Sequence, residues 1–244
     1  MTNISEKTLA SIVSEKYQTV PVLEKYNLDF CCKGKRTLSE ACIEKGLSLE
    51  SISNELENIV DSQVSIHMPF IEMTAEQLIA HILTHHHFYV KQSMPTILFH
   101  LEKVATKHGD SHTYMTSVLQ LFTEIKEEMD LHMQKEEQVL FPRIKDVETI
   151  FMQNKKATLA DGFISMPVNM MEAEHDHAGM IMNNIRQLTN NYTAPTSACT
   201  TFKLSLTELK EFEEDLHRHV HLENNLLFPL ATKMFQKVTA VTGI

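Results

Sequence analysis

The apolar positions of this chain recur every three or four residues over long stretches, which is the spacing of one helix face. The four longest stretches cover residues 75–107, 111–141, 167–191 and 197–228, with an irregular segment at 143–165. Only six glycines and seven prolines occur among 244 residues, which favours long uninterrupted helices. Four long helices in this order predict an all-α protein built on an up-down four-helix bundle.

Prolines mark the expected irregularities of these helices. Pro95 is expected to kink the first helix, because proline cannot donate the helical hydrogen bond. Phe141, just before Pro142, is expected to end the second helix, and Pro229 to end or bend the fourth.

Residues 1–62 show a different, shorter pattern. Apolar-periodic segments at 7–16, 20–27, 38–46 and 49–60 predict a small helical N-terminal domain. Thr37 with Glu40, and Thr74 with Gln77, have the spacing of helix capping boxes. The stretch DSQVSIHMPF (61–70) loses the periodicity, so we place a linker at 63–73 and the bundle domain at 74–238.

One eleven-residue phrase occurs twice in the predicted bundle. HMQKEEQVLFP (132–142) and HVHLENNLLFP (219–229) both read His-x-x-x-Glu, three residues, then Leu-Phe-Pro. His87 precedes His132 by 45 residues, and His175 precedes His219 by 44. Each half therefore supplies one histidine on its first helix and a His-x-x-x-Glu on its second. Two hairpins related by an approximate twofold axis would bring all six groups together.

Helical spacing places all six groups on apolar stripes. Residues three and four apart share a helix face, and the stripes are Leu83, His87, Val90 and Met94; Leu121, Ile125, Met129, His132, Glu136 and Val139; Met171, His175, Ala178 and Met182; and Leu209, Phe212, Leu216, His219, Glu223 and Leu226. Burying even one unpaired carboxylate costs at least several kcal/mol. A pair of metal ions would offset this cost, and nitrogen plus oxygen ligands suit iron or manganese, although ligand type alone does not exclude zinc.

Charge and cysteine content narrow the class of protein. The formal net charge is −10, which disfavours nucleic acid and anionic membranes as partners. The N-terminus MTNISEKTLA lacks a signal-peptide pattern, and no apolar stretch is long enough to span a bilayer. The four cysteines form no spaced disulfide framework, so we expect a cytoplasmic protein.

Two adjacent cysteines stand in the phrase YNLDFCCKGKRTL, residues 26–38. Cys31 and Cys32 can act as a thiol pair, and the basic residues Lys33, Lys35 and Arg36 are expected to lower their pKa values. The alternative, a pair of half-buried structural thiols, stays open at this point. Cys42 and Cys199 stand alone and are interpreted as packing residues.

These motifs together resemble a known family. HMQKEEQVLFPRI, EAEHDHAG and HLENNLLFP resemble the haemerythrin-like domain of the RIC (repair of iron centres, ScdA/YtfE) family of iron–sulfur cluster repair di-iron proteins. The Asp-Phe-Cys-Cys phrase is similar to the N-terminal domain of the same family. The resemblance implies two non-haem iron ions, oxo-bridged, with two bridging glutamates among the ligands His87, His132, Glu136, His175, His219 and Glu223. Haemerythrin itself uses five histidines, so four imply more open coordination.

Other ionisable residues lie near these positions. Of the consecutive His85, His86 and His87, the register of the repeat selects His87 as the ligand. Glu128, one turn before His132, and Glu174, beside His175, could support a ligand from behind, line a channel for iron or protons, or lie on a solvated face. The remaining neighbouring histidines are expected to be solvated: His81, His177, His217 and His221.

The resemblance implies repair of iron–sulfur clusters damaged by nitric oxide or peroxide in a stress response, with the di-iron centre as iron source. Damaged iron–sulfur proteins are the implied partners, together with small diatomics such as NO and O2, and the family suggests a homodimer. Whether the chain is an enzyme stays open, because the same centre could reduce nitric oxide to nitrous oxide. A haemerythrin-like oxygen- or NO-binding module is the third reading, and it leaves Cys31 and Cys32 without a role.

Overall fold

The computed structural model describes residues 4–60 and 70–239. Over these ranges it contains helices and no β-strand, and Thr8 and Thr37 form an isolated antiparallel bridge. The predicted all-α class is confirmed for these residues. Among the described helices, none combines the length and apolarity needed to cross a bilayer. Residues 63–69 of the predicted linker lie outside the described residues, and the domain boundaries stay a prediction.

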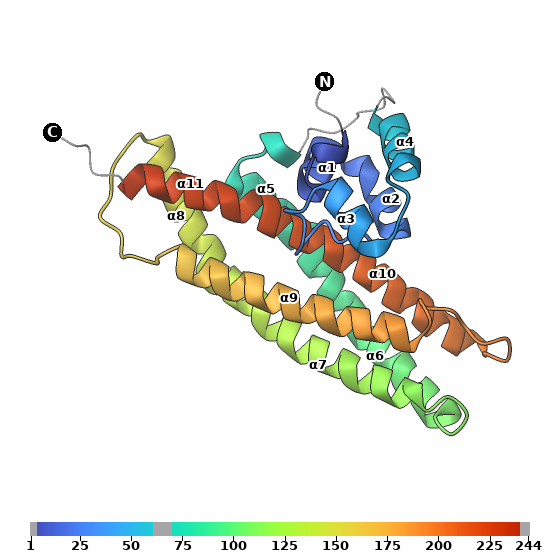
Figure 1. The fold of residues 1–244 in the computed structure, drawn as a ribbon. Helices are drawn as coiled ribbons and strands as arrows, with labels where there is room; N and C mark the ends of the chain where they lie inside the picture. The colour runs from blue at the N-terminus through green and yellow to red at the C-terminus, as the bar shows by residue number, and fades with distance from the viewer. Residues whose placement is uncertain (1–3, 61–69, 240–244) are drawn as a thin grey trace. The chain divides into compact units, whose positions relative to one another are not determined.

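The chain divides into two compact units, and the second contains residues 80–146 and 158–216. Its long helices are α6 (Phe88–His108), α7 (Tyr114–Lys135), α9 (Ser165–Leu188) and most of α10 (Thr200–Leu222). Figure 1 shows α7, coloured green, running beside α9, coloured orange. The helices bury their apolar stripes against one another, with Phe122 and Phe212 in an edge-to-face contact at 5.2 Å between ring centres.

Three short π-helical segments interrupt the α-helices. They are η4 (Ile82–His87) between α5 (Ala75–His81) and α6, η5 (Glu136–Leu140) after α7, and η6 (Glu223–Leu227) after α10. In η5 the Phe141 N–H donates to the Glu136 carbonyl, and in η6 the Phe228 N–H donates to the Glu223 carbonyl. Both bonds span five residues, so the repeated phrase encodes the same wide turn twice. Such π segments are rare and concentrate at functional sites.

The chain stays helical at Pro142 and Pro229, so the expectation that helices end there is wrong. After η5 the chain continues as α8 (Phe141–Met152), and after η6 as α11 (Phe228–Thr239). Each proline is the second residue of its new α-helix, where the missing N–H costs no α-helical bond. Residues 143–152 of the segment predicted as irregular are therefore helical. Helix α6 continues through Pro95, where the expected kink stays a prediction.

The first unit contains the described parts of residues 1–79, 147–157 and 217–244. Its N-terminal helices are α1 (Leu9–Glu15), α2 (Val20–Lys25), α3 (Leu38–Lys45) and α4 (Leu49–Val60), close to the predicted segments, with 3₁₀ turns at Ile4–Glu6, Tyr17–Thr19 and Phe70–Glu72. The capping boxes of Thr37 with Glu40 and of Thr74 with Gln77 are confirmed. Glu148 adds a third cap, since its carboxylate accepts from the backbone N–H groups of Ala75 and Glu76.

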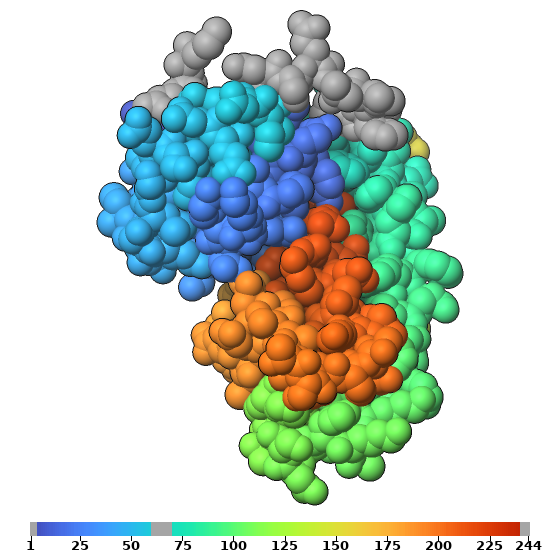
Figure 2. Space-filling view, turned by 90° about the vertical axis from the view of Figure 1, so that its right-hand side faces the viewer, coloured from blue at the N-terminus to red at the C-terminus, as the bar shows by residue number. Residues whose placement is uncertain are grey.

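The loop before α3 packs against the end of α10 within this unit. The Asn225 side-chain amide donates to the carbonyl of Cys31 at 3.0 Å, and the ring of His221 contacts Phe30 edge-to-face. Figure 2 shows the N-terminal helices, in shades of blue, gathered in one group. The double-cysteine loop is thus fixed by residues two positions on either side of Glu223.

Candidate metal centre

The six polar groups of the repeat are all buried. His87, His132, His175 and His219 are at most 2% exposed, and Glu136 and Glu223 are 0% exposed. They come from η4, α7, η5, α9, α10 and η6. The π segments place the same residue of each repeat in the same position, because Glu136 and Glu223 are the first residues of η5 and η6.

The ligand atoms of these six side chains form two overlapping groups. One consists of His87, Glu136, His219 and Glu223, and the other of His132, Glu136, His175 and Glu223. Within each group the atoms lie within 4.8 Å of one another, and both glutamates belong to both groups. The structure therefore brings together every residue that the repeat singled out, and both glutamates are shared by the two groups.

Individual distances fit two metal positions. Glu136 Oε2 lies 3.3 Å from His87 Nε2 and 3.4 Å from His132 Nε2, so one oxygen stands between the two groups. The Nε2 atoms of His132 and His175 are 3.0 Å apart, and His219 Nε2 lies 3.2 Å from Glu223 Oε1. Nitrogen ligands roughly 2.1 Å from one ion and at right angles to each other would lie about 3 Å apart. The four imidazoles and two carboxylates thus fit a pair of first-row metal ions.

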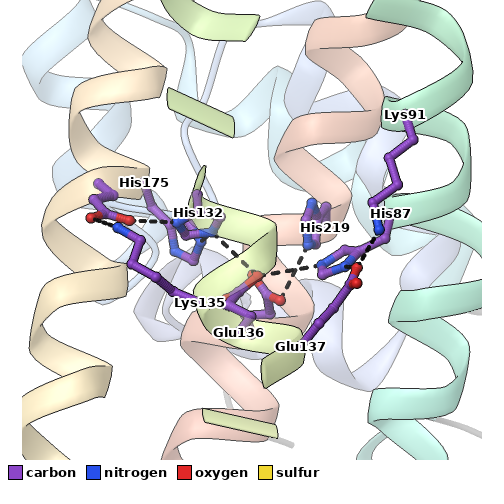
Figure 3. Close-up of polar contacts among 10 residues, drawn as sticks. His87, Lys91, His132, Lys135, Glu136, Glu137, His175 and His219 are labelled. Atoms are coloured by element: carbon purple, nitrogen blue, oxygen red, sulfur yellow. Dashed lines mark hydrogen bonds and ion pairs between the residues drawn. The ribbon is translucent and has the colours of Figure 1, made fainter. Parts of the chain in front are cut away.

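Two of the histidines are held from behind by carboxylates. His87 Nδ1 lies 2.7 Å from Glu137 Oε1, and His132 Nδ1 lies 2.8 Å from Glu174 Oε2 (Figure 3). A hydrogen bond from His132 lowers the pKa of Glu174 to about 2. Burial alone would raise the pKa of Glu137, but hydrogen bonds from Lys91 and His87 outweigh it, and the pKa is lowered.

Glu137 was missed by the sequence analysis, although it directly follows Glu136 in the repeated phrase. The second phrase has Asn224 at the matching position, so the repeat gave no signal for it. Glu174 was singled out for standing beside His175, yet it contacts His132 on the neighbouring helix instead.

A cavity of about 420 Å³ opens between α7 and α9 and reaches His132. Its apolar wall includes Met129, Leu131 and Met170, and its polar wall includes Glu128, Lys135, Glu174 and His177. Glu128 contacts His177 at 2.9 Å rather than one of the six converging residues. Its suggested role beside a channel stays a prediction.

The neighbouring histidines do not all lie in solvent. His221 is fully buried, so its predicted solvation is wrong, and burial lowers its pKa to about 4. His86 is also buried, with Nδ1 3.0 Å from Asp215 Oδ1, and therefore does not compete with His87 for the centre. His81 and His217 are half-buried.

The two adjacent cysteines lie in a turn organised by Asp29. Its carboxylate accepts from the backbone N–H of Cys31 at 3.1 Å and of Cys32 at 3.0 Å, and the Cys31 thiol lies 3.2 Å from the same oxygen. All four cysteines are free thiols. Hydrogen bonding to Cys32, burial and the Asp29 charge raise the pKa of Cys31 well above its ordinary value. The expected lowering by the nearby basic residues is therefore wrong for Cys31, because buried neighbours act more strongly than exposed charges.

This environment predicts that the Cys31 thiol reacts slowly with alkylating reagents. In the folded protein, iodoacetamide at pH 8 is expected to modify exposed Cys199 first and Cys31 at least roughly tenfold more slowly, because the thiolate is the reactive form. Timed quenching and peptide mass spectrometry would give both rates, and a sample unfolded in urea is the control in which the rates should converge. Equal rates in the folded protein would contradict the assigned environment.

The fold and the centre define a class of protein: a helical bundle with a buried histidine–carboxylate centre of the haemerythrin type. Residues 78–231 match the haemerythrin HHE cation binding domain family, and residues 5–60 match the ScdA_N family, a domain of unknown function (DUF542). The chain belongs to the haemerythrin-like family of iron–sulfur cluster repair proteins.

Its relatives include the iron–sulfur cluster repair protein YtfE of Shigella boydii serotype 4 (strain Sb227) and of Escherichia coli O8 (strain IAI1). Both are 35% identical over 210 residues, which are 86% of this chain and 89% of each relative. YtfE of Citrobacter koseri is 34% identical with the same coverage. The resemblance inferred from the motifs is confirmed.

Proposed function

We propose that this chain is a di-iron protein that repairs iron–sulfur clusters damaged by nitrosative or oxidative stress, and that it does so by supplying iron. The observation that supports this proposal most directly is the pair of buried histidine–glutamate groups, which overlap because Glu136 and Glu223 belong to both. The relatives' name, iron–sulfur cluster repair protein, supports the same role. The four free thiols suit the reducing cytoplasm that we propose as its location.

The chain's own residues would hold the metal as follows. His87 and His219 would bind one ion, His132 and His175 the other, and the two glutamates would bridge them. The bound iron, oxo-bridged, would supply an exchangeable and redox-active metal. Four imidazoles and two carboxylates would give each ion fewer than six protein ligands, so positions would remain open for exchange.

Metal analysis and an iron-transfer assay test this proposal. The purified protein should contain about two irons per chain, and it should restore the visible spectrum of a nitric-oxide-damaged iron–sulfur protein in the presence of a ferrous chelator. An equal amount of ferrous salt with the same chelator is the control. Two bound irons without any recovery of the cluster would overturn the repair role and leave the centre intact.

The cavity beside His132 favours a second candidate, reduction of nitric oxide to nitrous oxide, since it gives small diatomics a route toward the centre. Multiple turnovers of NO with an added reductant would distinguish this enzyme from an iron donor. We propose that Cys31 and Cys32 serve the repair role as a thiol pair. A Cys31→Ser/Cys32→Ser variant whose biological activity stayed intact would instead favour a haemerythrin-like binding module.

A further inference from the structure

Two histidines of the centre, His87 and His132, each contact a carboxylate through Nδ1. His87 contacts Glu137 through Nδ1, and Lys91 Nζ lies 2.6 Å from the same Glu137 oxygen. On the other side of the centre, His132 contacts Glu174 through Nδ1, and Lys135 pairs with the other Glu174 oxygen. Each lysine lies about one helical turn after a histidine. Lys91 comes four residues after His87, and Lys135 comes three residues after His132. The chain thus contains two Lys–Glu–His arms.

The arms lie on opposite sides of Glu136. Figure 3 shows Lys91, Glu137 and His87 on one side and His132 with Lys135 on the other. Each arm crosses from surface to core, because the lysine side chains are 47% and 39% exposed, the glutamates about a third exposed, and the histidines at most 2% exposed. His87 belongs to one four-residue group and His132 to the other, so each group contains one arm.

From this arrangement we infer that Glu137 and Glu174 are positioning residues, one for each metal position, and that Lys91 and Lys135 hold them in place. The inference rests on the two-metal centre proposed above and adds the residues that set how firmly each ion is kept.

The physical reason lies in the single N–H of a neutral imidazole. An ionised carboxylate can only accept, so Nδ1 must carry the proton and Nε2 keeps its lone pair for the metal. The hydrogen bond also fixes the ring plane and makes Nε2 more basic. The lysine holds the glutamate carboxylate turned toward the histidine, which is why a surface residue can influence a buried ligand.

Five variants test the inference: Glu137→Ala, Glu174→Ala, their combination, and the milder Lys91→Met and Lys135→Met, which leave the buried residues unchanged. Exposed Glu127 on α7 and half-buried Glu172 on α9 do not line the cavity, so Glu127→Ala and Glu172→Ala are matched controls. Iron stoichiometry is measured after dialysis against a ferrous chelator, together with the rate of iron release under reducing conditions and helix content by circular dichroism.

Each glutamate variant is expected to weaken one metal position about 10- to 100-fold, to keep roughly one iron per chain, and to leave helix content unchanged. The double variant should keep almost no iron. Glutamine in place of Glu137 or Glu174 should retain more iron than alanine does, since an amide oxygen still accepts a hydrogen bond from the Nδ1 N–H. The lysine variants should release iron faster than the controls.

Single variants that retain both irons at the wild-type release rate would overturn the positioning role. Loss of both irons from either single variant would overturn the assignment of one arm to each position. If the wild-type chain itself held fewer than two irons, the proposed di-iron centre would fail instead, so the two failures are distinguishable.

Discussion

Replacing Glu136 by glutamine is expected to destabilise the iron-loaded protein and to stabilise the metal-free protein. Glu136 is fully buried and belongs to both groups of candidate metal ligands. Its negative charge therefore stabilises the fold only when metal cations are bound. Without metal, the buried carboxylate still carries a desolvation cost on the order of several kcal/mol, which a neutral amide of the same shape largely avoids.

With metal the sign reverses. A ligand present at 1,000 times its dissociation constant adds about 4 kcal/mol to the stability of the state that binds it, and this linkage is lost when affinity falls. Urea unfolding of metal-free and iron-loaded samples would give both changes, with Glu172→Gln as the control for a glutamate outside the centre. A variant that lowered stability equally with and without metal would contradict the view that metal offsets the buried charge.

The second large effect concerns Arg186 in the bundle. Arg186 forms two hydrogen-bonded contacts with the buried carboxylate of Glu213, at 2.9 Å and 2.8 Å, and the Tyr192 hydroxyl donates to the same carboxylate at 2.9 Å. We expect Arg186→Met to lower the free energy of unfolding by about 3–5 kcal/mol, because it leaves a buried charge without its cation.

A double-mutant cycle gives the control for this prediction. Arg186→Met/Glu213→Leu should recover most of the loss, since no charge then remains to be compensated. Lys203→Met on the exposed surface of α10 should change stability by less than about 0.5 kcal/mol. Urea unfolding of the metal-free protein measures all three, and a double variant as unstable as Arg186→Met would contradict the argument.

Arg186 also bears on the connection between α9 and α10. Asn190, Asn191 and Tyr192 all have positive φ angles, of 47°, 57° and 58°, a conformation that is costly for residues with side chains. The hydrogen bond from Tyr192 to Glu213 ties this turn to α10. The helix that carries His219 is therefore tied to this turn through Glu213, six residues before His219.

The sequence by itself determined which residues matter and on which helix face they lie. Helical spacing put His87, His132 and Glu136 on apolar stripes, and an apolar stripe must be buried against another element, so these groups had to enter the core. The duplicated phrase then indicated that two halves present the same ligands, and the capping boxes of Thr37 and Thr74 fixed helix starts from local hydrogen bonding alone.

Only the tertiary structure decided how these groups are supported and what their surroundings do to them. Pro142 and Pro229 were expected to end helices, but the π segments that let the chain continue depend on hydrogen bonds that proline spacing does not reveal. Glu174 contacts a histidine on another helix, and the thiol of Cys31 is governed by Asp29 and burial rather than by nearby basic residues. The physical reason is common to all three: periodicity reports which face of a helix is buried, whereas hydrogen bonds between helices and pKa values depend on which atoms the packed chain places within a few ångströms.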